Sequence, residues 1–160
     1  MDVLWQELIY GLPDGRHLKM VLIRIVAATL FGAAIGFQRE LSGKPAGLRT
    51  HMLVCFGTAL VVVACSVDGM DMNGLSRVIQ GIVTGIGFVG AGSILKLSEQ
   101  REIKGLTTAA GLWMTAAIGV AVGLGSLGVA LIGTAMTLFV LSLIGAIEAR
   151  LEHRHQKDQT

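Results

Sequence analysis

The longest uncharged segment of this chain covers residues 105–147, which contain no Asp, Glu, Lys or Arg. Residues 50–67 and 78–95 form two shorter segments of the same kind. The hydrocarbon core of a bilayer is about 30 Å thick, so a helix needs about 20 apolar residues to cross it. Each short segment is therefore long enough for one membrane span and the long segment for two. This pattern excludes a water-soluble enzyme.

Residues 20–38 form a further apolar stretch with one charge, Arg24, and are predicted to be the first span. A cleaved signal peptide is the alternative, but acids precede the stretch and no small-residue cleavage site follows it. Three glycines and a serine in residues 123–128 favour a tight turn inside the long segment. We therefore predict an all-α, polytopic membrane bundle of about five transmembrane helices. Their expected ranges are 20–38, 51–67, 78–96, 108–123 and 127–147.

The distribution of Lys and Arg predicts the orientation, because basic residues near span ends are retained in the cytoplasm. Most of them follow the first, third and fifth spans. The amino terminus is therefore expected outside and the carboxyl terminus in the cytoplasm. Residues 1–19 would be an extracytoplasmic segment, either an interfacial helix or an extension of the first span. Residues 20–147 would form the transmembrane domain and residues 148–160 a basic cytoplasmic tail.

A faint internal repeat accompanies these spans. Residues 47–50 and 105–108 read Gly-Leu-Arg-Thr and Gly-Leu-Thr-Thr, and each segment follows a basic loop and opens an apolar helix. Two copies of a two-span unit keep the same orientation in the membrane. The pattern therefore indicates a parallel two-helix repeat.

Residues 85–90 match the dinucleotide-binding fingerprint G-x-G-x-x-G, but they lie inside an uncharged membrane segment. The fingerprint needs a preceding strand and a solvated helix start. We interpret the glycines instead as seams that let helices approach closely, since lipid gives no hydrophobic drive for association. No cofactor is predicted. The predicted helix-packing residues are Gly32, Gly36, Gly81, Gly85, Gly87, Gly90 and Gly92.

Arg24 is the least favourable residue in any predicted span, because an arginine at mid-membrane costs about 2.5–3.5 kcal/mol on insertion scales. Two interpretations remain open. The side chain either snorkels to the headgroups, since it follows Lys19 by five residues, or it faces the bundle interior. In the second case it would pair with a carbonyl, a carboxylate or an anion.

The third predicted span carries a polar face. Arg77, Gln80 and Thr84 share a sector of about 80° with Gly87 and Ala91 at 100° per residue. An unsatisfied amide in hydrocarbon costs several kcal/mol, so this face is not expected to contact lipid. It is predicted either to bind other helices or to line a polar cavity.

Polar residues also mark the starts of the second and fourth spans, where Thr50, Thr107 and Thr108 are predicted to cap the helices. A helix start also attracts anions, so a phosphate or acidic lipid head is the second interpretation of this region. His51 is interpreted as a satisfied interfacial histidine. The candidate functional polar residues are Arg24, Arg39, Glu40, Arg49, Thr50, His51, Arg77, Gln80, Thr84, Thr107 and Thr108.

No metal site, catalytic site or nucleic-acid partner is predicted. Asp68 and Asp71 are a close carboxylate pair, but their segment reads as a solvated turn, and no predicted span contains an acid. No hydrolase elbow, catalytic acid pair or Walker loop has a suitable context. The net charge of +2 comes without a basic stripe, which excludes nucleic acid as a partner.

Three stretches carry a specific resemblance, namely residues 36–54, 84–92 and 104–113. With their strings Lys-Pro-Ala-Gly-Leu-Arg-Thr-His and Gly-Leu-Thr-Thr-Ala-Ala, the chain resembles the MgtC/SapB family over about residues 20–145. The resemblance implies a bacterial inner-membrane protein. Family members are associated with growth at low magnesium and with virulence through survival in macrophages, and the resemblance does not imply direct magnesium transport.

The chain departs from the family pattern in two ways. Gln38 stands where the family often has Glu, and Gly74-Leu75 stands where it often has Asp-Pro, so the acidic partners of Arg39 and Arg77 are in doubt. The sequence also ends at Thr160, without the soluble carboxyl-terminal domain of MgtC-like virulence factors. We therefore expect it to be closer to the short, SapB-like members.

The leading prediction is a non-enzymatic membrane protein that modulates a membrane complex or supports adaptation to low magnesium or to the intracellular niche. Its expected partners are the lipid bilayer, further copies of itself in a homo-oligomer, and another membrane complex. The alternative is a small-solute or ion transporter or channel. Its polar path would lie near Arg24, Arg77, Gln80 and Thr84.

Overall fold

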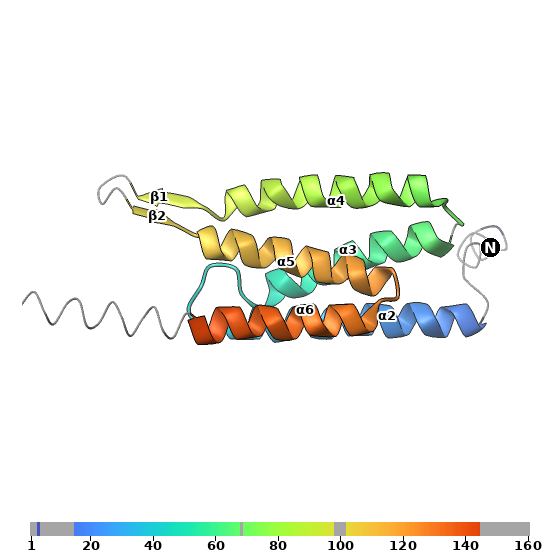
Figure 1. Cartoon of the computed structure of the whole chain (residues 1–160), viewed down its shortest axis with the longest axis horizontal. Coiled ribbons are helices and arrows are strands. Elements are labelled where there is room, and N and C mark those ends of the chain that lie inside the picture. Colours follow the sequence, from blue (N-terminus) through green and yellow to red (C-terminus); the bar gives the residue numbers. More distant parts are fainter. Residues whose placement is uncertain (1–2, 4–14, 68, 98–101, 145–160) are drawn as a thin grey trace, which may run out of the picture.

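The computed structural model describes residues 3, 15–67, 69–97 and 102–144, which form an elongated bundle of helices (Figure 1). The helices are α2 (Gly15–Leu41), α3 (Leu48–Val67), α4 (Met72–Gly92), α5 (Leu106–Gly123) and α6 (Leu127–Phe139). A π-helical segment, η1 (Val140–Ile144), continues α6. Strands β1 (Leu95–Leu97) and β2 (Glu102–Lys104) pair antiparallel between α4 and α5.

The bundle has two ends that carry different connections (Figure 1). We call the end with β1, β2 and the α2–α3 loop the hairpin end. The opposite end, called the turn end, holds the start of α2, the α3–α4 connection and the turn between α5 and α6. Helices that follow one another in the chain run in opposite directions, so α2, α4 and α6 share one direction and α3 and α5 the other (Figure 1). This arrangement is compatible with the predicted parallel repeat, which stays a prediction.

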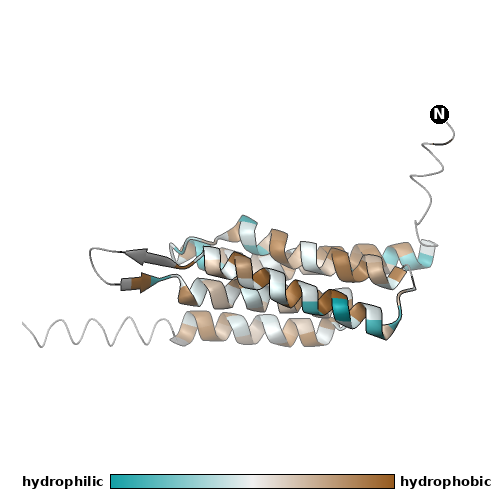
Figure 2. Ribbon diagram, turned by 90° about the horizontal axis from the view of Figure 1, so that it is seen from above, coloured by the Kyte–Doolittle hydropathy of each residue, from teal (hydrophilic) through white to brown (hydrophobic). Residues whose placement is uncertain are grey.

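Four of the described helices are long and apolar enough to cross a membrane, namely Gly15–Leu41, Leu48–Val67, Met72–Gly92 and Leu106–Gly123. Leu127–Leu143 is a shorter apolar helix. Hydrophobic residues cover most of the helix surfaces, and hydrophilic residues gather near the helix ends (Figure 2). The chain is therefore a multi-pass, all-α membrane bundle, as the uncharged segments predict.

Four helices begin earlier than predicted, and the difference is largest for α2 and α4, at five and six residues. α2 starts at Gly15, so residues 15–19 belong to a helix rather than to a separate terminal segment. α4 starts at Met72, where the Asp71 carboxylate accepts a 2.8 Å hydrogen bond from the Gly74 amide and caps the helix. The prediction placed Asp71 in a solvated turn, and its role as an N-cap explains why the helix extends to it.

Two helices also end earlier than predicted. The predicted span 78–96 stops at Gly92, because residues 95–97 pair with β2 as a strand. The predicted span 127–147 changes to a π-helix at Val140, and residues 145–147 lie outside the described residues. The terminal segment 1–14, apart from residue 3, and the basic tail 148–160 also lie outside them. Their predicted roles are therefore not described.

The core lies where α2, α3 and α5 pack together, with α6 closing one side. At Gly36 of α2 an added Cβ would lie 2.7 Å from the Leu48 Cα atom of α3, so only glycine allows this approach. Gly32 makes an equally close approach one turn away, and both glycines pack as predicted. Gly123 of α5 does the same against Val62 of α3, although the sequence analysis did not predict it.

Helix α4 lies at the margin of the bundle, against α5 and to a smaller extent α3 (Figure 1). Gly90 packs against Ala109 of α5. The other glycines predicted to pack on this helix do not pack against another described element, because no atom of one lies within 4 Å of a Cβ added to them. They are Gly81, Gly85, Gly87 and Gly92.

Candidate functional site

Arg39 is a buried cation inside the bundle at the hairpin end. Because α2 continues to Leu41, the residue lies within the helix rather than in a loop, and it is only 3% exposed. Its Nη2 atom donates a 2.8 Å hydrogen bond to Oγ1 of Thr108 on α5, while its Nε atom is buried without a hydrogen-bond partner. A buried charge is costly unless it is paired, and this one is met by a neutral hydroxyl group.

His51, in the first turns of α3, is fully buried at the same end. Its Nδ1 atom lies 3.1 Å from the carbonyl oxygen of Gly47, so Nδ1 carries the proton of that hydrogen bond. Its Nε2 atom is buried without a partner, on the side of α5 where Gly111 lies. The prediction of a satisfied interfacial histidine is therefore wrong, since the ring is buried and half satisfied.

These two residues meet one face of α5. Thr108, which contacts Arg39, and Gly111, which faces His51, are three positions apart and so lie next to each other on the helix surface. We call Arg39, His51 and Thr108 the hairpin-end cluster. It brings together three of the predicted polar residues from three different helices. Thr108 therefore binds a side chain of another helix instead of capping its own helix.

The start of α3 is capped by Glu40 and not by Thr50. The Glu40 Oε2 atom accepts a 2.9 Å hydrogen bond from the Leu48 amide, eight residues along the chain. The Glu40 carboxylate thus occupies the helix start at which a phosphate or an acidic lipid head was the second interpretation. A hollow of about 480 Å³ remains beside it, lined by Arg49 and Thr50 in the first turn of α3 and by residues of the α2–α3 loop. At the start of α5 the N-cap residue is Gly105, without a side-chain cap.

Arg24 faces the turn between α5 and α6. Its Nη1 atom donates a 3.0 Å hydrogen bond to the carbonyl oxygen of Gly123. A Cβ added to Gly125 would lie 2.6 Å from its Nη2 atom, so the guanidinium group rests on the turn itself. This geometry favours the interior interpretation, in which the arginine pairs with a carbonyl.

The polar face of α4 is exposed. Arg77, Gln80 and Thr84 are all classed as exposed, and Phe88 on the same helix is 85% exposed. The Thr84 hydroxyl donates to the carbonyl oxygen of Gln80 and so is satisfied within the helix. α2 and α4 lie on opposite sides of α3 and α5 (Figure 1). The structure therefore does not bring Arg24 together with Arg77, Gln80 and Thr84.

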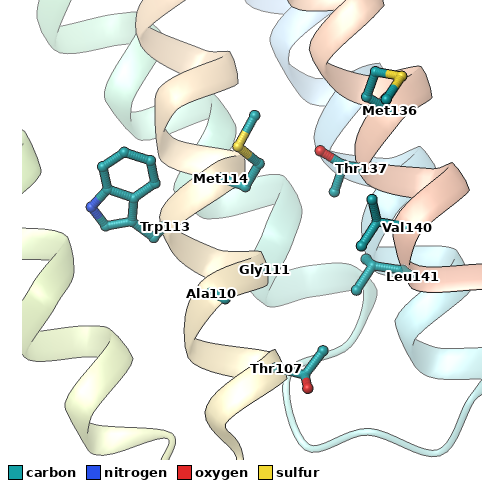
Figure 3. A pocket seen from close by; sticks show the side chains of 9 residues that line it. All are labelled: Thr107, Ala110, Gly111, Trp113, Met114, Met136, Thr137, Val140 and Leu141. Atoms are coloured by element: carbon teal, nitrogen blue, oxygen red, sulfur yellow. The ribbon is translucent and has the colours of Figure 1, made fainter. Parts of the chain in front are cut away.

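An apolar groove of about 580 Å³ runs between α5 and the α6–η1 segment (Figure 3). The Thr137 hydroxyl on its wall donates its proton to the Gly133 carbonyl, so it can only accept a hydrogen bond from a ligand. The groove can accommodate an apolar group, but none of the described residues that line it is an acid or a base. No local pattern in the sequence predicts the groove, because its two walls come from separate helices. Its residues are Thr107, Ala110, Gly111, Trp113, Met114, Met136, Thr137, Val140 and Leu141.

Residues 25–150 match the family model described as "MgtC family", which is most of the chain. The chain belongs to the MgtC family. It is 44% identical over 142 residues to protein SrpB of Synechococcus elongatus, a match that covers 82% of this chain and 78% of SrpB. No solved structure matches the chain.

In two further relatives of this MgtC-family chain, the match covers only part of the relative's length. The putative magnesium transporter YhiD of Escherichia coli K12 is 41% identical over 84% of this chain and 65% of its own length. Protein MgtC of Salmonella typhimurium is 42% identical over 73% of this chain and 49% of its own length. The match therefore spans about two thirds of YhiD and about half of MgtC.

The MgtC-family match includes the hairpin-end cluster and the α4 face, while Arg24 lies one residue before it. Among the described residues, no group of three or more His, Cys, Asp or Glu side chains is placed to hold a metal ion. Gln38 donates a 3.4 Å hydrogen bond to the carbonyl oxygen of Leu141 in η1. Its Oε1 atom is buried without a partner.

Proposed function

We propose that this MgtC-family chain is a non-enzymatic membrane protein that binds other transmembrane helices through α4 and thereby modulates a membrane complex. The observation that carries the proposal is the open α4 face. Gly81, Gly85 and Gly87 have no neighbour within 4 Å of an added Cβ, although they lie in a membrane-spanning helix. Small residues on a span allow close helix contact, and close packing is a main source of helix association in lipid.

The polar residues of α4 support the same proposal. Arg77 and Gln80 are exposed on a helix of a membrane bundle, where polar groups are costly unless they find partners. The glycine seams of α2 and α5 are already filled by α3, whereas no other element of the described part of the chain fills the α4 seam. A helix of a second copy, as in a homo-oligomer, or of another membrane protein would cover both the glycines and the polar side chains.

The physiological setting is proposed from the family. YhiD is named a putative magnesium transporter, and we assign this chain a role in adaptation to low magnesium or to life inside a host cell. We place it in the bacterial inner membrane with the hairpin end in the cytoplasm. Arg39, Lys44, Arg49 and Lys104 lie toward that end, as the retention of basic residues in the cytoplasm requires.

A transporter is the second candidate, and the name of YhiD favours it. Within one chain, however, Arg24 and Arg77 lie on helices that do not pack together. A shared polar path would therefore need more than one copy. Uptake of magnesium into liposomes that contain the purified chain separates the candidates, because the binding role predicts no uptake above protein-free liposomes.

Gly85→Leu tests the proposed function, because a leucine side chain would block close approach to α4. A matched control is Gly128→Leu on α6, where an exposed glycine also has nothing within 4 Å. Each tagged variant is purified from membranes that also contain a differently tagged wild-type copy. The second tag detects association between copies, and mass spectrometry identifies any other membrane protein that is purified with the variant. We expect Gly85→Leu to lose its partner while Gly128→Leu retains it. Equal recovery in both variants would contradict the proposal.

A further inference from the structure

A cavity of about 320 Å³ lies at the turn end, between the first turns of α2 and the last turns of α3. Ligand sites in proteins commonly measure about 300–1,000 Å³, so this one suits a small ligand or part of a larger one. We call it the turn-end cavity. It is lined by the polar residues His17, Arg24 and Ser66 and by the apolar residues Met20, Val21, Val63 and Val67.

The cavity exists because the α5–α6 turn stops short of the ends of α2 and α3 (Figure 1). Arg24 rests on that turn, while α2 begins nine residues earlier at Gly15, about 13 Å away at 1.5 Å per residue. Gly125 in the turn has φ +84°, a conformation that favours glycine. The absence of a side chain at this position leaves the space that the guanidinium group occupies.

The α5–α6 turn contacts Arg24 but does not accept hydrogen bonds from all of its N–H groups. The guanidinium group has five N–H donors, and the structure gives it one hydrogen bond, to the Gly123 carbonyl oxygen. None of its nitrogen atoms is among the buried, partnerless atoms of the described residues, so the remaining N–H groups keep some exposure, and Arg24 lines the cavity. His17 adds a further ring nitrogen, and no Asp or Glu is among the described residues that line the space.

We propose that the turn-end cavity binds a phosphate-type anion, with Arg24 as the principal ligand. A guanidinium group forms short, paired hydrogen bonds to phosphate oxygens, and its fixed charge attracts anions to a site whose described lining residues include no carboxylate. The phosphate would come either from inorganic phosphate in water or from the headgroup of an anionic lipid. This site is separate from α4, so it does not depend on the function proposed above.

The test uses the full chain purified in detergent and freed of bound lipid. In the first arm, binding of inorganic phosphate is measured by calorimetric titration. In the second arm, the protein is reconstituted with phosphatidylcholine alone or with phosphatidylcholine and phosphatidylglycerol, and native mass spectrometry measures the lipid that it retains. The variants are Arg24→Gln, Val67→Trp and, as the matched control, Arg77→Gln. Val67→Trp narrows the cavity and leaves the bond between Arg24 and Gly123 intact, so it remains informative if Arg24→Gln does not fold.

We expect saturable binding of at least one probe, weakened about ten-fold or more in Arg24→Gln and Val67→Trp and unchanged in Arg77→Gln. Binding of phosphate would identify the free anion as the source, and retention of phosphatidylglycerol alone would identify the lipid headgroup. The proposal is overturned if neither probe binds saturably. Equal binding in the wild type and Val67→Trp would also overturn it.

Discussion

The Nη2 atom of Arg39 on α2 donates a 2.8 Å hydrogen bond to Oγ1 of Thr108 on α5, although 69 positions separate the two residues in sequence. Both side chains are buried, at 3% and 2% exposure. The bond therefore ties the first described helix to the fourth through the interior of the hairpin end. It also means that a neutral hydroxyl is the group that stabilises a buried cation.

Thr108→Val should remove this hydrogen bond and leave the guanidinium group without its partner. We expect the free energy of unfolding to fall by about 1.5–3 kcal/mol, the range for hydrogen bonds to charged groups. The measurement is thermal or denaturant unfolding of the purified protein in detergent. Thr134→Val is the control, because the buried Thr134 hydroxyl donates only to the Ala130 carbonyl of its own helix. An equal loss of unfolding free energy in both variants would contradict a stabilising role for the hydrogen bond between α2 and α5.

Gly36→Ala should destabilise the contact between α2 and α3. The new Cβ would lie 2.7 Å from the Leu48 Cα atom, so the backbones must separate, at a cost of about 1–3 kcal/mol. Gly57→Ala is the matched control, since no atom lies within 4 Å of its added Cβ. There the higher helix propensity of alanine should leave stability unchanged or raise it by about 0.5–1 kcal/mol. Unfolding in detergent compares the two, and a stable Gly36→Ala protein would contradict this packing.

Glu40→Ala should expose the first turn of α3 by removing the carboxylate that holds the Leu48 amide. The free energy of unfolding should fall by about 1 kcal/mol, as it does when other helix caps are removed. Hydrogen–deuterium exchange of the peptide containing Leu48 should become faster. Glu40→Gln keeps an acceptor oxygen and should show an intermediate rate. If the exchange rate is the same in all three proteins, Glu40 does not cap α3 in solution.

Trp113 should be accessible to lipid chains, because it is 46% exposed and lines the apolar groove beside α5. In a Trp5→Phe background its fluorescence reports on this position alone, since the chain has two tryptophans. Phosphatidylcholine with brominated acyl chains should quench it strongly, whereas iodide in the water should not. The opposite pattern would mean that this part of α5 lies outside the bilayer.

The membrane spans could be predicted from the sequence because a bilayer imposes a simple requirement. Backbone groups in lipid must be bonded within a helix, so long uncharged segments read directly as helices. Lack of charge does not show where a helix ends, however, and so the predicted span 78–96 included residues 95 and 96, which belong to strand β1. In the same way, Arg39 read as a loop charge, because its burial depends on which face of α2 meets α5.

The packing seams were predicted only in part, for a similar reason. The spacing Gly-x-x-x-Gly marks a small-residue face and leaves open whether that face is filled. Gly32 and Gly36 pack against α3, whereas Gly81 and Gly85 pack against no other element that the structure describes. Gly119 and Gly123 have the same spacing and pack closely on α3, so this signal was present in the sequence. The cap by Glu40 had no local signal, since eight residues separate it from Leu48.

The central claim is that α4 uses its open face to bind another transmembrane helix. Its most direct test is photo-crosslinking in intact membranes, with a photoreactive amino acid placed at Thr84 on the exposed face or at Ile86, which is 8% exposed within the bundle. The account predicts a crosslinked product of higher mass from position 84 and none from position 86. A crosslink from both positions, or from neither, would contradict it.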